Sequence, residues 1–256
     1  MSPSRLPTHE APAASADAPR EVSVVVRPGA VQGTLDRGPA WRRRSAADDG
    51  LPRATPWSKR VTDVTLVTVS SPLWLTLLGL IAVAVRLDSR GPAFFVQPRF
   101  GRDGRVFRLL KFRSMHQHAD AALAEHLAAC PDRSAEWDRH HKLRDDPRIT
   151  RVGRLLRRLS LDELPQLINV LVGDMSLVGP RPVPVVERAK YGEAFSLYVR
   201  VRPGLTGPWQ VNGRNELPYE RRKTLDKAYV RGRTFRGDMR IILKTFGAVW
   251  SRRGAY

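Results

Sequence analysis

The chain has 256 residues, a formal net charge of +19 and one cysteine, Cys130. This length suits one sizeable domain or two small ones, and a single cysteine excludes an internal disulfide. The first 56 residues hold 8 arginines and 6 acids, so most of the positive charge lies further along and predicts an anionic partner: nucleic acid, an acidic membrane surface or a phosphorylated substrate.

Residues 1–56 are rich in Ala, Pro, Ser, Arg and Asp and show almost no hydrophobic periodicity. Such a composition cannot bury enough apolar surface to fold by itself, so we predict a disordered polar tail. No apolar run follows the first few residues, and we therefore expect no signal peptide.

An uncharged apolar run, Val64–Val85, comes next. As a straight helix of roughly 22 residues it would reach about 33 Å, enough to cross a bilayer. Ser71 and Pro72 interrupt it, because proline removes a helical hydrogen bond. Both flanks are basic, which favours the same side of the membrane for both ends. We predict a re-entrant membrane helix at 57–90 with its hinge at Ser71 and Pro72; a kinked single span and a buried core helix remain alternatives.

The segment after this run predicts a short β-hairpin. Strands are expected at 93–97 and 106–110 around the turn at 101–104, with Lys111 and Arg113 at the end of the second strand.

Two helices are then expected on either side of Ser160. Apolar residues of 149–159 recur at helical spacing between arginines, which indicates an amphipathic helix with a cationic face. Ser160-x-x-Glu163 fits a capping box that starts a second helix, and Gly173 can end that helix. Asp162 and Glu163 would then simply stabilise the helix start.

The same two acids also suit phosphate chemistry. The helix dipole and Arg157 or Arg158 would keep Asp162 ionised, and an ionised carboxylate can attack phosphorus to form an acyl phosphate. Glu163 can hold Mg²⁺ together with substrate phosphate oxygens. Four cations are available to offset the repulsion between the anions; they are Lys111, Arg113, Arg157 and Arg181.

A loop dense in Gly and Pro follows at 198–217 and predicts an ordered cover over the site. Its candidate nucleotide- or sugar-binding residues are Arg202, Trp209, Gln210, Asn212 and Arg214. For Trp209, stacking on a ligand, insertion at the lipid boundary and simple packing all remain open. The amphipathic stretch 238–253 fits an interfacial helix as well as a core helix.

With these motifs in this order, the chain resembles the bacterial sugar transferases that start glycan assembly on a polyprenol carrier, the monotopic polyprenol-phosphate phosphoglycosyl transferases. The resemblance runs from Lys59 to Tyr256. The segments that carry it are 59–63, the Ser-Pro break, 91–115, 146–182, 202–214 and 254–256.

The resemblance implies transfer of a sugar 1-phosphate from a UDP-sugar, expected to be a UDP-hexose, to undecaprenyl phosphate with release of UMP. Asp162 would be the nucleophile of a covalent aspartyl-phosphosugar intermediate, and Glu163 would assist with Mg²⁺. Arg157 and Arg181 would bind phosphate. Such a reaction is the first membrane step of exopolysaccharide, O-antigen or capsule-type synthesis.

The expected fold is α/β, mostly α: a membrane-anchored monotopic domain with the re-entrant broken helix, the short β-hairpin and amphipathic interfacial helices. We expect a tail at 1–56, the membrane helix at 57–90 and a catalytic domain at 91–256 on the cytoplasmic face of the bacterial inner membrane. Membrane lipids are expected partners, and a homodimer is left open.

Two other functions compete with this prediction. The charge alone would also suit a membrane-tethered nucleic-acid binder, but no DNA-reading motif is present, so no nucleic-acid partner is expected. An inactive scaffold of the same family is disfavoured because the acids and arginines are intact.

Overall fold

The computed structural model describes residues 57–117, 119, 123, 127–128, 146–213 and 217–250, with the side chains of 249 and 250 excepted. The predicted tail at 1–56 and Arg214 lie outside these residues.

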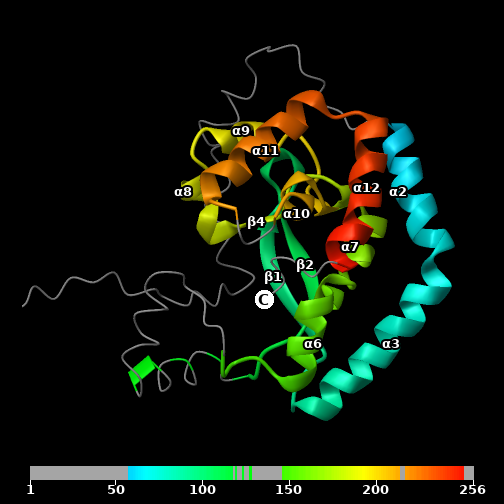
Figure 1. Ribbon diagram of the computed structural model, residues 1–256, viewed down its shortest axis with the longest axis vertical. Helices are drawn as coiled ribbons and strands as arrows, with labels where there is room; N and C mark the ends of the chain where they lie inside the picture. Colours follow the sequence, from blue (N-terminus) through cyan, green and yellow to red (C-terminus); the bar gives the residue numbers. More distant parts are fainter. Residues whose placement is uncertain are drawn as a thin grey trace, which may run out of the picture. The chain divides into compact units, whose positions relative to one another are not determined.

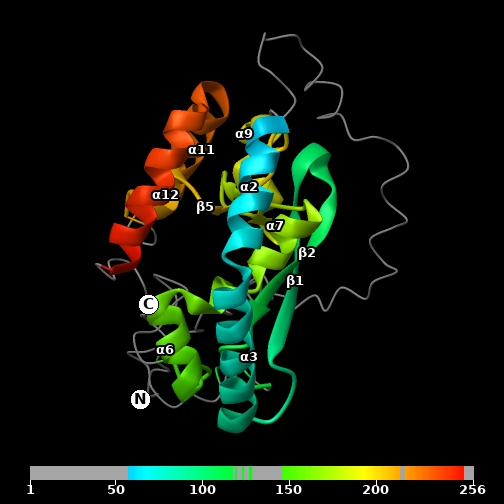
Figure 2. The ribbon, with the colours of Figure 1, turned by 90° about the vertical axis from the view of Figure 1, so that its right-hand side faces the viewer.

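Two helices, α2 (Trp57–Val69) and α3 (Ser71–Asp88), run end to end (Figures 1 and 2). Helix α2 lies beside α7 (Gln166–Val172), and α3 lies beside α6 (Arg151–Leu159). The helix is interrupted at Ser70, two residues before Pro72, so the predicted helix break is confirmed. The Ser70 hydroxyl donates to the Leu66 carbonyl at 2.7 Å, and Trp74 Nε1 donates to the Val67 carbonyl at 2.9 Å. Side chains thus satisfy carbonyls at the break, as an apolar environment requires.

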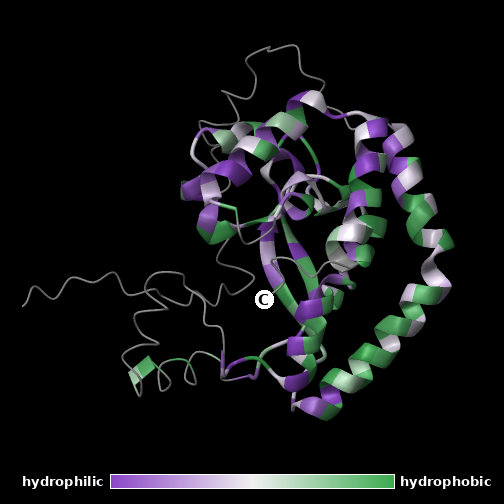
Figure 3. Cartoon of the chain, viewed as in Figure 1, coloured by the Kyte–Doolittle hydropathy of each residue, from purple (hydrophilic) through white to green (hydrophobic). Residues whose placement is uncertain are grey.

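Helix α3 shows most of its apolar surface. Within the described part of the chain, it is the helix whose length and composition would allow it to cross a membrane, and 17% of it is buried. The inner face packs Ile81 and Val85 against Phe112 and Leu156. Most of α3 is hydrophobic (Figure 3). Leucines and valines on its outer face are exposed, among them Leu73, Leu80, Val83 and Leu87. This exposure disfavours the buried core helix.

Polar contacts fix α2 to the rest of the domain. Lys59 forms an ion pair with Asp238 of α12 (Phe235–Trp250), and Arg60 donates to the last carbonyls of α7 (Gln166–Val172). Asp63, which is buried, accepts a hydrogen bond from Ser176 Oγ at 2.6 Å. These residues share one face of α2, since they recur at helical spacing.

The predicted hairpin is confirmed, with longer strands than expected. Strands β1 (Phe94–Phe100) and β2 (Val106–Phe112) pair antiparallel. Strand β4 (Val183–Pro184) joins the free edge of β1. A separate parallel pair consists of β3 (Ser176–Val178) and β5 (Gly204–Thr206). The described domain is therefore a mostly helical α/β fold with little sheet.

The segment between α6 (Arg151–Leu159) and α7 differs from the prediction. Ser160 has a left-handed backbone with φ of 57°, and its N–H donates to the Arg157 carbonyl, so it ends α6. A 3-10 turn, η3 (Leu161–Glu163), follows, and α7 begins only after Pro165. The capping-box prediction is wrong, because this tight turn takes the place of a helix start; Gly173 ends α7 as predicted.

The C-terminal half packs around aromatic residues. Tyr191, Phe195 and Tyr198 form a cluster with Phe100 at the end of β1. Helix α12 packs Ile241 and Ile242 inward, while Leu243 and Phe246 on its other side are exposed. The remaining elements are η4 (Val185–Glu187), α8 (Arg188–Tyr191), α9 (Ala194–Tyr198), α10 (Pro208–Val211) and α11 (Tyr219–Gly232).

Candidate active site

Asp162 and Glu163 lie in η3, where the end of β2 brings a lysine to both of them. Lys111 Nζ lies 2.8 Å from Glu163 Oε1 and 3.7 Å from Asp162 Oδ2. Arg181, from the Pro180-Arg181-Pro182 segment, places Nη1 3.4 Å from the same Glu163 oxygen. Three separate parts of the chain therefore meet at the acid pair.

Arg157 reaches this region from the last turn of α6. Its Nε donates to Ser114 Oγ at 2.8 Å, which fixes the guanidinium beside the end of β2. Its positive charge acts on the Asp162 carboxylate. Of the four predicted phosphate-binding residues, the structure thus brings Lys111, Arg157 and Arg181 together at the dyad.

Burial and the neighbouring positive charges act in opposite directions on Asp162. Burial raises the pKa of Asp162 above its usual value and the Glu163 charge adds to this rise, although Lys111, Arg157 and Arg181 oppose it. The sequence predicted that the helix dipole and Arg157 or Arg158 keep Asp162 ionised at neutral pH, and this stays a prediction. Desolvation prevails because the carboxylate is largely withdrawn from water, which disfavours its charged form.

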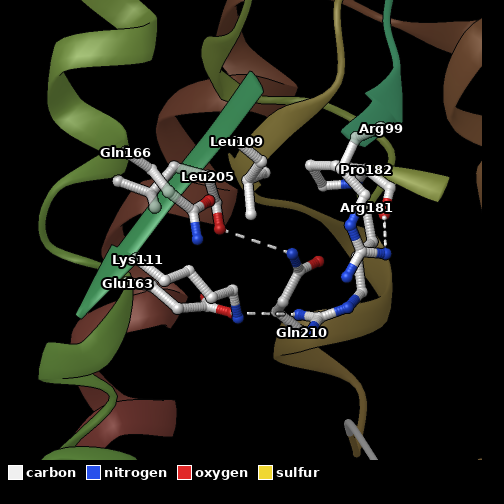
Figure 4. A pocket seen from close by; sticks show the side chains of 9 residues that line it. All are labelled: Arg99, Leu109, Lys111, Glu163, Gln166, Arg181, Pro182, Leu205 and Gln210. Atoms are coloured by element: carbon white, nitrogen blue, oxygen red, sulfur yellow. Dashed lines mark hydrogen bonds and ion pairs between the residues drawn. The ribbon is translucent and has the colours of Figure 1, made fainter. Parts of the chain in front are cut away.

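A small hollow opens beside the dyad, with an empty volume of about 220 Å³ that includes its open mouth. Figure 4 shows Lys111, Glu163 and Gln166 on one side of it and Arg99 and Arg181 on the other. Gln210 of α10 lies between them, and its buried Oε1 has no hydrogen-bond partner among the described residues. Its ligand-binding role remains a prediction. Sequence reasoning missed Arg99 and Gln166, since no local motif distinguished either from other residues of its element.

Other predicted site residues have contacts elsewhere. Arg113 donates to the Ser89 and Arg90 carbonyls just after α3, at 2.7 and 2.8 Å. Arg202 Nε donates to the Gly173 carbonyl at the end of α7, at 2.7 Å. Asn212 bonds the Pro208 carbonyl at 2.6 Å on the surface. These contacts join elements of the fold, and the ligand-binding roles of these residues remain predictions.

Trp209 lies inside the domain, with 8% of its surface exposed. The guanidinium of Arg181 lies 5.0 Å from its ring centroid and that of Arg222 lies 5.3 Å away. Both distances suit cation–π contacts. Burial and these contacts favour the packing interpretation of Trp209 over insertion at the lipid boundary.

The carboxylate pair also bears on metal binding. In the part of the chain that the structure describes, no group of three His, Cys, Asp or Glu side chains could enclose a metal ion. Mg²⁺ commonly uses one or two carboxylates, water and substrate phosphates instead of an all-protein cage. Glu163 fits that arrangement, in which substrate phosphate oxygens and water would supply the other ligands.

Comparison with known proteins identifies the family. The family model described as bacterial sugar transferase matches residues 54–252. The chain belongs to the bacterial sugar transferase family. The match includes every described element from α2 to α12, with the acid pair near its middle.

Several curated members of the bacterial sugar transferase family are similar to the chain. It is 44% identical over 203 residues to the exopolysaccharide production protein ExoY of Sinorhizobium fredii, covering 78% of this chain and 88% of the relative. It is 44% identical over 208 residues to the undecaprenyl-phosphate galactose phosphotransferase of Salmonella typhimurium, covering 80% and 43%. It is 39% identical over 233 residues to the UDP-glucose:undecaprenyl-phosphate glucose-1-phosphate transferase of Caulobacter vibrioides, covering 87% and 81%.

The chain spans less than half of some bacterial sugar transferases that it matches. It covers 42% of an uncharacterized sugar transferase of Haemophilus influenzae and 43% of the Salmonella protein. The similarity to these relatives therefore concerns the part that contains the acid pair and the broken helix.

Proposed function

We propose that the protein transfers a sugar 1-phosphate from a UDP-hexose to undecaprenyl phosphate, with release of UMP. The observation that carries the proposal is the Asp162–Glu163 pair held among Lys111, Arg157 and Arg181 beside an open hollow. The substrates are proposed by analogy with the Salmonella and Caulobacter relatives, whose names contain undecaprenyl phosphate and UDP-glucose. By analogy with ExoY, the product would enter exopolysaccharide synthesis.

In the first step, an Asp162 carboxylate oxygen attacks the phosphorus that bears the sugar. A bond forms between this oxygen and phosphorus, and the bond from phosphorus to the bridging oxygen breaks. The electron pair leaves with that oxygen on UMP. The positive charges of Lys111, Arg157 and Arg181 offset the repulsion between the carboxylate and the two phosphates. They also stabilise the negative charge that develops on the leaving oxygen.

In the second step, a phosphate oxygen of undecaprenyl phosphate attacks the same phosphorus. The acyl phosphate bond breaks and restores the Asp162 carboxylate, and the sugar remains on the new lipid diphosphate. Because UMP leaves first, the acceptor phosphate and the UMP phosphate need not occupy the site together.

Mg²⁺, when bound, would neutralise phosphate charge at this site. Glu163 is the protein group we propose to hold it, together with substrate phosphate oxygens. Lys111 and Arg181 share one Glu163 oxygen, Oε1, and their two positive charges keep the carboxylate aligned beside Asp162.

We also propose that the domain is anchored in the bacterial inner membrane through α3, with the site on the cytoplasmic face. The exposed leucines and valines of α3 would contact lipid tails. The break at Ser70, with its satisfied carbonyls, allows the helix pair to bend within the bilayer and return to the same side. Basic residues on both flanks favour this re-entry.

Replacing the nucleophile tests the chemistry. Asp162→Asn should abolish UMP release from UDP-glucose or UDP-galactose in the presence of undecaprenyl phosphate, whereas Asp103→Asn, on an exposed turn, should leave it unchanged. EDTA should stop the wild-type reaction and added Mg²⁺ restore it. Donor labelled in the sugar should leave its label on Asp162; label on another side chain would exclude the mechanism.

Cysteine labelling tests the topology. In a chain whose native Cys130 is replaced by serine, single cysteines at Ser58 and Phe95 should both react with a membrane-impermeant reagent from the cytoplasmic side. Both side chains are exposed in the structure. Labelling from opposite sides would establish a single span and refute re-entry.

A further inference from the structure

Arg99 is a cation of the hollow that the proposed mechanism does not use. It lies on β1 and lines the hollow on the side opposite to Lys111 and Glu163 (Figure 4). Its Nη1 donates to the Pro182 carbonyl at 3.1 Å and its Nη2 to Gln97 Oε1 at 2.6 Å. These two bonds fix the guanidinium next to the segment that carries Arg181.

The positive charge of Arg99 is poorly compensated. No carboxylate of the described residues lies within ion-pair distance of it, and its buried Nε has no hydrogen-bond partner among them. Burial lowers the pKa of Arg99 to about 10; the charges of Arg181 and Arg222 contribute to this decrease, and the Glu187 charge opposes it only in part. A partly buried cation held near two others is costly unless an anion binds there.

We propose that Arg99 and Arg181 form an anion subsite that binds the phosphate remaining with the nucleotide. The inference rests on the proposed function and assigns Arg99 a binding role within it. Arg181 contacts Glu163 on one side and faces Arg99 on the other. The sugar-bearing phosphate would lie at Asp162, and the adjacent phosphate would lie between the two guanidinium groups. Arg222, which lies against the Trp209 ring, adds positive charge near Arg99.

Position favours the nucleotide over the lipid acceptor as the source of this phosphate. Strand β1 begins near the apolar cluster that Phe112 forms with α3, and it ends in the aromatic cluster of α8 and α9. Arg99 is five residues along β1 from Phe94, about 16 Å in an extended strand. Lys111 pairs with Phe95, near the α3 end. A polyprenyl chain reaching the dyad along the exposed face of α3 would therefore arrive at the end away from Arg99.

Calorimetric titration of the full chain in nanodiscs tests the subsite with UMP, uridine and a short-chain polyprenyl phosphate. Arg99→Gln should weaken UMP binding about 10- to 100-fold, the range for a lost charge-assisted hydrogen bond, and leave uridine and polyprenyl phosphate binding unchanged. Arg99→Lys should retain part of the UMP affinity. Arg108→Gln, on the same hairpin with an exposed side chain, is the matched control and should bind UMP like the wild type.

The possible results separate the subsite from the underlying proposal. Unchanged UMP affinity in Arg99→Gln, or weaker binding of the polyprenyl phosphate alone, would overturn the subsite while leaving the transferase proposal standing. A wild-type chain that binds neither UMP nor uridine would overturn the donor class, and the subsite with it. Uridine affinity and the melting temperature of Arg99→Gln and Arg99→Lys separate a lost contact from misfolding.

Discussion

At the scale of single residues, Asp162 combines a reactive position with an unfavourable environment. Burial raises its pKa, so the ionised carboxylate destabilises the folded state at every pH above that raised value. The cost decreases as the pH falls through the folded-state pKa and is absent below the pKa of the unfolded chain. Nucleophilic attack thus requires the ionised form of Asp162, whereas the stability of the fold favours its neutral form.

We therefore expect Asp162→Asn to have a higher melting temperature than the wild type at neutral pH, while its transfer activity falls about a thousand-fold or more. The difference in stability should shrink on acidification, because asparagine does not titrate. Thermal denaturation of both proteins between pH 4 and pH 8 measures this. A variant that is less stable than the wild type at neutral pH would contradict the expectation.

Trp209 belongs to the same scale, since its ring supports the guanidinium of Arg181. Trp209→Leu should raise the KM for the donor about 3- to 30-fold, in line with a partly buried cation–π contact. Trp209→Phe retains an aromatic face and should raise KM less. Steady-state kinetics with a melting curve for each variant checks this, and equal effects of Leu and Phe would argue against the contact.

At the scale of elements, α6 depends on a close approach to the end of β2. A Cβ on Gly153 would lie 2.2 Å from the Ser114 carbonyl oxygen, which belongs to the backbone and cannot easily move. The same contact holds Arg157 in place, because Arg157 Nε bonds Ser114 Oγ one turn later. The absence of a side chain at Gly153 therefore determines where a phosphate-binding arginine lies.

Gly153→Ala should destabilise the protein by about 1–3 kcal/mol, as overpacking of a tight contact does, and should reduce transfer because Arg157 is displaced. Gly232→Ala is the matched control, since a Cβ there meets no atom within 4 Å, and both its stability and its activity should stay close to those of the wild type. Denaturant unfolding with activity assays compares the two variants. If Gly153→Ala is destabilised but transfers sugar phosphate at the normal rate, the packing of α6 does not determine the catalytic position of Arg157.

At the scale of the whole molecule, the family match begins at residue 54, and among the described residues Lys59 already contacts α12. Deleting residues 1–50 should therefore leave kcat within about two-fold, because the deletion lies outside the family match and keeps the Lys59 contacts. Deleting residues 1–70 also removes α2, with the Lys59–Asp238 ion pair and the Arg60 contacts to α7, and should abolish folding or activity. Expression, melting temperature and kcat distinguish the two truncations.

Local sequence signals determined a large part of this protein. The uncharged run with Ser71 and Pro72 predicted a long, broken apolar helix, two short segments around the turn at 101–104 predicted the hairpin, and Gly173 predicted the end of α7. The order of the motifs around Asp162 and Glu163 indicated the family. These features depend on neighbours in the chain, so the sequence could carry them without knowledge of the fold.

Only the tertiary structure decided which side chains share the site. Lys111 and Glu163 are 52 positions apart in the sequence, yet Lys111 Nζ lies 2.8 Å from Glu163 Oε1. Arg99 lines the same hollow although no motif marks it. Arg113 and Arg202 looked equally suitable but bond backbone carbonyls elsewhere. Long-range packing makes this choice, because burial and the left-handed turn at Ser160 set the position and the pKa of Asp162, and neither can be read from residue spacing.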